Sequence, residues 1–243
     1  MSRFFVSFAA LAALLLLPLA ATAQEEAPAR PFVYASYFEC ESTDQWMADM
    51  IVETVYKPVY DAAVEDGTIS AWGWLSHHTG GKWRRGIYHI APTVDALLDA
   101  SDAVGEKIGE TNAQAARQFG KICNVHEDYI WRSVNGSGDG VDVAMVPSKA
   151  GVSMYMVCDM AKQERADELM AAFAPVYNSH VKEGELSGWG WLQHQVGGKY
   201  RRLLTMRGAD HKSVLAAWGA IVEEMDEKHD AASTEFSEIC YTH

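Results

Sequence analysis

The stretch SAWGWLSHHTGGKWRR, residues 70–85, returns later in the chain as SGWGWLQHQVGGKYRR, residues 187–202. The two copies lie 117 residues apart, as the first tryptophan of each shows (189 − 72), and this offset continues on both sides. Further upstream, Cys40 matches Cys158 at an offset of 118 (158 − 40). The repeat is about 100 residues long, which is too long for a solenoid repeat, and two repeats are too few for a solenoid. We therefore expect two small domains of one kind.

Each copy has a pattern that predicts a strand, a helix, two strands, a second helix and a short last strand. The glycine pairs at 80–81 and 197–198 supply the positive φ that a two-residue hairpin turn requires. We expect Ser42 to cap the first helix, with Gln45 completing a capping box, and Pro58 to kink it. The last strand of the second copy must be very short or missing. In the first copy the elements are expected at 33–41, 42–67, 69–79, 82–92, 94–123 (a helix with a break) and 126–133.

The order β-α-β-β-α-β, with both helices on one sheet face, is that of a ferredoxin-like α+β module. Two such modules can close their sheets against each other, and here the chain resembles the dimeric α/β-barrel superfamily in a tandem-duplicated form. The resemblance implies an intramolecular pseudo-dimeric α/β barrel, a monomer with an internal pseudo-twofold axis. The expected segments are a signal peptide at 1–23, an N-terminal extension at 24–32, a first module at 33–134, a linker at 135–141 and a second module at 142–243.

The N-terminus has the features of an export signal. Arg3 is followed by an apolar run at 4–20 and by the small-x-small pattern of Ala21-Thr22-Ala23. We therefore expect cleavage after Ala23 and a mature protein that is periplasmic or secreted. No later stretch is apolar and long enough to span a membrane. The net charge is 20 − 33 = −13, which disfavours nucleic acid as a partner.

The four cysteines recur in the two copies, and an even number in an exported chain indicates disulfides. All three pairings are compatible with the repeat. Because each copy can close its own loop, we favour Cys40–Cys123 and Cys158–Cys240. The alternative is a zinc set built from two Cys-x-x-His pairs, at 123–126 and 240–243.

The hairpin turns fix which residues share a sheet face. Counting outward from the glycine pairs, Ser76 faces Arg85 and Trp74 faces Ile87. One face then carries Trp72, Trp74, Trp83, Arg85, Ile87 and His89, and the other carries Gly73, Leu75, His77, Arg84, Gly86 and Tyr88. We favour the arrangement in which the tryptophan face lines the space between the two sheets, because ligand pockets favour aromatic linings. In the alternative the tryptophans lie under the helices.

The candidate ligand-binding residues are aromatic and basic side chains of these strands, with the arginines placed to hold an acidic group. They are Tyr37, Trp72, Trp74, Arg84, Arg85, Tyr155, Trp189, Trp191, Arg201 and Arg202. If the protein is an enzyme, His77 or His194 would accept the proton. The same two histidines could meet across the pseudo-twofold axis around a metal ion, with Glu39 or His89, but no ligand spacing supports a metal.

Motifs for phosphate loops, nucleophile elbows and haem attachment are missing from the sequence, so no cofactor is expected. The hypothesis that fits these observations is an exported, non-catalytic protein that binds a small flat or acidic ligand. The superfamily resemblance implies an alternative, a small oxygenase or isomerase acting on an aromatic substrate. A structural module of the cell envelope is the third reading.

Overall fold

The computed structural model describes residues 30–79, 81–137 and 148–242, so the expected signal peptide and most of the expected linker lie outside the described residues. The N-terminal half contains β1 (Phe32–Glu39), α1 (Gln45–Ile51), the π-helical segment η1 (Val52–Tyr56), α2 (Lys57–Glu65), β2 (Ala71–Ser76), β3 (Arg85–Ala91), α3 (Val94–Ile122) and β4 (Val125–Gly136). The C-terminal half contains β5 (Ala150–Cys158), α4 (Gln163–Lys182), β6 (Gly188–Val196), β7 (Arg202–Gly208), α5 (His211–Ile239) and β8 (Cys240–Thr242).

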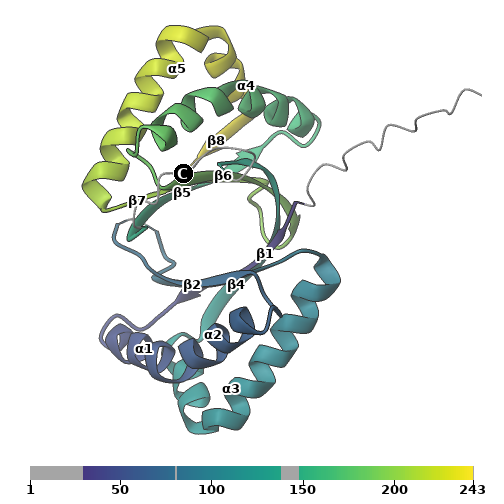
Figure 1. Cartoon of the computed structure of the whole chain (residues 1–243), viewed down its shortest axis with the longest axis vertical. Helices are drawn as coiled ribbons and strands as arrows, with labels where there is room; N and C mark the ends of the chain where they lie inside the picture. Colours follow the sequence, from purple (N-terminus) through teal and green to yellow (C-terminus); the bar gives the residue numbers. More distant parts are fainter. Residues whose placement is uncertain (1–29, 80, 138–147, 243) are drawn as a thin grey trace, which may run out of the picture.

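The strands form one antiparallel sheet in the order β2-β3-β1-β4-β6-β7-β5-β8. Each half contributes four neighbouring strands, and the pairing of β4 with β6 joins them. The sheet curves so that its two halves face each other, and the helices cover its outer faces (Figure 1). The fold is therefore mixed α+β, as the sequence predicts. β4 continues through Gly136, into the first residues of the expected linker.

The strand registers confirm the predicted pairing in both halves, although β2 and β3 are shorter than the expected strands at 69–79 and 82–92. Trp74 pairs with Ile87 and Ser76 with Arg85, while Trp191 pairs with Leu204. Gly81 and Gly197 have φ of +49° and +129°, values that favour glycine over other residues. Gly198 does not have the expected positive φ.

The preferred sheet face is wrong, because the tryptophans of β2 lie under the helices. The indole of Trp72 stacks on Tyr60 of α2 with ring centroids 4.8 Å apart, and Trp74 donates through Nε1 to Asp49 of α1. A broad indole fills the space below the helices, while its N–H finds an acceptor on them, so burial leaves no donor unpaired. Trp83 departs from the predicted face, because β3 begins only at Arg85 and strand alternation does not extend back to it.

The first helix also differs from its prediction. It begins at Gln45 after Asp44, with no side-chain cap, and the side-chain oxygen Oε1 of Gln45 accepts instead from Arg85. Between α1 and α2 the helix widens into η1, and Pro58 follows as the second residue of α2. The expected break in the second helix is confirmed by a non-helical backbone at Asn112 within α3.

The one-residue difference between the two offsets explains η1. From Asp49 to Pro58 the chain advances nine residues (58 − 49), whereas the corresponding step from Asp167 to Pro175 is eight (175 − 167). Asp49 and Asp167 are equivalent, since each accepts from a strand tryptophan and binds a strand arginine. The N-terminal half therefore carries one extra residue, which a wider helical turn accommodates.

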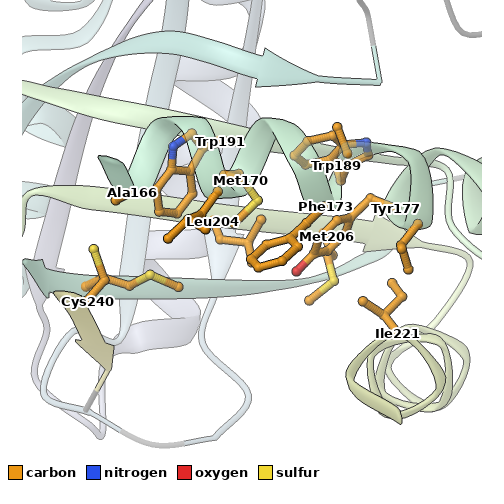
Figure 2. Packing of buried hydrophobic residues seen from close by; sticks show 14 of the residues in the cluster. Ala166, Met170, Phe173, Tyr177, Trp189, Trp191, Leu204, Met206, Ile221 and Cys240 are labelled. Carbon is orange, nitrogen blue, oxygen red and sulfur yellow. The ribbon is translucent and has the colours of Figure 1, made fainter. Parts of the chain in front are cut away.

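The disulfides Cys40–Cys123 and Cys158–Cys240 confirm the favoured pairing and remove these cysteines as zinc ligands. Each bond ties the end of a first strand to the end of a long helix. In the C-terminal half the space between the sheet and α4 and α5 is filled by apolar side chains, among them Phe173, Trp191 and Met206 (Figure 2). The last strand of this half, β8, has three residues, in line with the expectation.

Candidate functional site

The corresponding space in the N-terminal half contains a pocket of about 360 Å³. It lies between the outer sheet face and the helices η1, α2 and α3, and its volume falls in the range of small-molecule sites. Aromatic, small and polar side chains line it. They are Tyr34, Ser36, Phe38, Tyr56, Tyr60, Ile87, His89, Ser101, Val104, Gly105, Ile108, Gly109, Ala116 and Phe119.

The most distinctive polar group of this pocket is the imidazole of His89. This side chain is only 4% exposed, and its ring stacks on Tyr34 with centroids 5.4 Å apart. Its Nε2 lies 3.3 Å from the carbonyl oxygen of Leu97 and 3.1 Å from Oγ of Ser101. Burial lowers the pKa of His89, so the ring is neutral at neutral pH.

The polar residues of this pocket are replaced by apolar ones at the equivalent positions of the other half. The offsets of 117 and 118 place Met206, Trp218 and Met154 where the N-terminal half has His89, Ser101 and Ser36. All three pack in or against the apolar cluster of the C-terminal half. On α3, Gly105 and Gly109 add further room, since a Cβ at either position would meet nothing within 4 Å.

The π-helical segment η1 supplies Tyr56 to the pocket wall. Tyr56 contacts Phe119 with ring centroids 5.1 Å apart, and its counterpart in the regular helix α4 is Phe173. Burial raises the pKa of Tyr56 to about 12, so its phenol stays protonated. Single-turn π segments inside helices occur frequently at functional sites. Here the extra residue lies in one of the helical segments that cover the pocket.

Several predicted site residues instead hold the helices on the sheet. Arg85 binds both carboxylate oxygens of Asp49, at 2.7 Å each, and Arg202 binds those of Asp167 at 2.7 and 2.8 Å. These two arginines therefore neutralise protein carboxylates. Trp72, Trp74, Trp189 and Trp191 likewise donate to helix side chains, namely Asp61, Asp49, Asn178 and Asp167.

The space between the two halves of the sheet is packed with aromatic rings. Tyr37 and Tyr155, one from each half, meet with centroids 5.3 Å apart, and Trp83 contacts both of them. Tyr129 and Trp131 stack on each other in the same cluster. Burial raises the pKa of Tyr37 to about 12. This cluster holds the halves together.

The candidate catalytic histidines lie near the hairpin tips, away from the pocket. Nδ1 of His77 contacts the carbonyl oxygen of Trp83, and Nδ1 of His194 accepts from Arg201 at 3.0 Å. Burial and the neighbouring Arg201 lower the pKa of His194. Arg84 lies beside His77, with one guanidinium nitrogen 3.4 Å from the His77 carbonyl oxygen. The structure thus brings each histidine to an arginine, but His77 and His194 do not line the pocket.

Within the described ranges, the structure contains no group of three or more His, Cys, Asp or Glu side chains that could hold a metal ion. None of the helices among those residues has the length and apolar character needed to cross a bilayer.

Comparisons with known proteins identify the fold but no family. No family model and no curated protein sequence matches the chain. Solved structures do match. A provisionally assigned chlorite dismutase has a TM-score of 0.53, with 11% identity over 88% of this chain and 91% of that chain. A provisionally assigned monooxygenase from Lactobacillus acidophilus NCFM has a TM-score of 0.53, with 8% identity over 81% and 88%.

A third match, an anthrone oxidase-like protein, has a TM-score of 0.51, with 13% identity over 88% of each chain. These similarities, together with the curved antiparallel sheet, define the chain as a protein of the dimeric α/β-barrel fold.

Sequence reasoning named His89 only as a possible metal ligand and missed the pocket. Comparing the two halves position by position would have pointed to it, because His89, Ser101 and Ser36 are polar where their counterparts are apolar. A polar residue in one half opposite an apolar residue in the other indicates that the space under the helices is filled differently in the two halves.

Proposed function

We propose that this protein binds a small planar organic molecule in the pocket of its N-terminal half. The observation that carries the proposal is the contrast between two halves of one fold. One half fills the space under its helices with apolar side chains, and the other keeps about 360 Å³ there, lined by aromatic rings and a buried neutral histidine. Aromatic walls with few polar groups are typical of small-molecule sites.

We take this function to be binding without catalysis. In the alternative, the protein is an oxygenase or isomerase that acts on an aromatic substrate in the same pocket. The names of the similar structures motivate that alternative. His89, rather than His77 or His194, would then be the proton acceptor, because it is the histidine that lines the pocket.

We further propose that the two halves are copies of one ferredoxin-like module and that the chain is an exported monomer with an internal pseudo-twofold axis. The repeated sequence, the equivalent strand orders and the equivalent disulfides support the duplication. Disulfides and an N-terminal sequence of signal type support export. The test is mass spectrometry of the exported protein, which should give a mature chain that begins at Gln24.

Calorimetric titration of the purified protein with a panel of bicyclic aromatic compounds tests the binding function. We expect saturable binding by the wild type and its loss in Ser101→Trp, which introduces the residue of the C-terminal half and fills the pocket. The matched control is Trp218→Phe, which alters the equivalent position of the other half and should leave binding unchanged. Equal binding by the wild type and Ser101→Trp would place the ligand elsewhere.

A further inference from the structure

We propose that the pocket selects an uncharged aromatic ligand that carries a hydrogen-bond donor, such as a phenolic hydroxyl, and that Nδ1 of His89 accepts this hydrogen bond. This inference rests on the binding function proposed above. It adds the chemical class of the ligand and assigns His89 as the residue that determines specificity.

The contacts of His89 favour one tautomer of its neutral ring. We assign the proton of the neutral ring to Nε2, because the carbonyl oxygen of Leu97, 3.3 Å away, can only accept. Oγ of Ser101 donates to the same carbonyl at 3.0 Å, which leaves the hydroxyl oxygen able to accept from Nε2 as well. In a neutral imidazole with the proton on Nε2, Nδ1 is a hydrogen-bond acceptor.

The acceptor Nδ1 has no hydrogen-bond partner among the described residues, since both polar contacts of the ring involve Nε2. Among the described residues, some unpaired side-chain atoms are fully buried, such as Nε1 of Trp83, but Nδ1 of His89 is not one of them. It therefore keeps some accessible surface. The His89 ring lines the pocket. A ligand donor placed there would therefore complete the hydrogen bonding of a largely buried ring.

The charge of the lining excludes acidic ligands. The pocket residues include no lysine or arginine. Arg85 lies on β3 two residues before Ile87, and it is paired with Asp49. Burial lowers the pKa of His89 and so disfavours an imidazolium that could balance an anion. Burial and, to a smaller extent, the carboxylate of Asp128 raise the pKa of Tyr34, so Asp128 places a negative charge near the pocket edge. A buried carboxylate would thus lose its hydration without gaining a counter-charge.

The experiment compares three ligands of nearly equal shape by calorimetric titration of the full protein at pH 7.5: 2-naphthol, 2-methoxynaphthalene and 2-naphthoate. We expect 2-naphthol to bind about tenfold or more tightly than its methyl ether, because the ether cannot donate. We expect 2-naphthoate to bind more weakly than 2-naphthol. In His89→Phe the preference for naphthol over the ether should disappear, while the ether still binds. The matched control is His211→Phe, which makes the same exchange at the start of α5, outside the pocket, and should keep the preference.

A second readout is independent of the variants. The ¹⁵N chemical shift of His89 Nδ1 should move on addition of 2-naphthol and stay unchanged with the ether. If no member of the panel binds, the proposed function is wrong. If naphthol and its ether bind equally to the wild type, the binding function stands and the assignment of His89 is overturned. Tightest binding of 2-naphthoate would overturn the exclusion of acidic ligands.

Discussion

The buried ion pair between Arg202 and Asp167 offers a quantitative test of how the helices are held on the sheet. The Arg202 side chain is 1% exposed, and its guanidinium donates five hydrogen bonds: to both carboxylate oxygens of Asp167, to two oxygens of Gln163 and to the carbonyl oxygen of Arg201. The substitution Asp167→Asn keeps the shape but removes the counter-charge. Leaving such a buried charge unpaired costs about 3–5 kcal/mol.

The N-terminal half supplies the matched comparison. There Asp49 binds Arg85, but the Asp49 side chain is 39% exposed against 22% for Asp167, and the Arg85 side chain is 8% exposed. Water reaches this pair and screens the remaining charge, so Asp49→Asn should cost about 1–2 kcal/mol. Both variants can be measured by urea unfolding followed by tryptophan fluorescence, with the disulfides intact. A loss below 1 kcal/mol in Asp167→Asn, or a larger loss in Asp49→Asn, would refute the argument.

Three further outcomes are expected. Because burial lowers the His89 pKa, the folded protein binds fewer protons than the unfolded chain at mildly acidic pH. The free energy of unfolding should therefore have its full value above the unfolded histidine pKa of about 6.5 and decrease as the pH falls through the folded pKa. Urea titrations at pH 7.5 and 5 should show a smaller decrease in His89→Phe than in the wild type. Removing Cys40–Cys123 with paired serines should cost about 4 kcal/mol, because this bond closes a loop with a sequence separation of 83; an unchanged urea midpoint would contradict that. Ser101→Trp should raise the urea midpoint, because the indole fills the pocket, and a crystal structure should show the indole between the sheet and the helices. A lowered midpoint would contradict this.

The hairpin register was predictable because it depends on local chemistry. The two glycine pairs permit a tight turn, and once the turn is placed, every pairing in the hairpin follows from counting. The disulfides followed from locality in the same way. The choice of sheet face was not predictable, because both faces of β2 and β3 carry aromatic side chains. What decides it is a partner on another element: Asp49, 25 residues before Trp74, provides the acceptor for its N–H.

The pocket could not be predicted from one half alone, because its lining comes from residues far apart in the chain. Ser36 lies on β1, His89 on β3 and Ser101 on α3, and none of them belongs to a recognisable motif. The extra residue in the first helix gave a signal in the sequence, since the offset changes from 118 to 117 between Asp49 and Pro58. Its meaning depends on knowing that a helix absorbs one residue as a wider turn.

Comparison of the two halves also indicates that the fold does not require the pocket. The C-terminal half reaches the same strand order and disulfide with Met206 and Trp218 in place of His89 and Ser101, and it packs these positions with apolar side chains. A buried imidazole and an unfilled volume both lower stability relative to that packing. Selection for stability alone would therefore favour the apolar solution in both halves. The C-terminal half has this apolar packing and the N-terminal half has a pocket instead, which is the physical reason to look for a ligand in the N-terminal half.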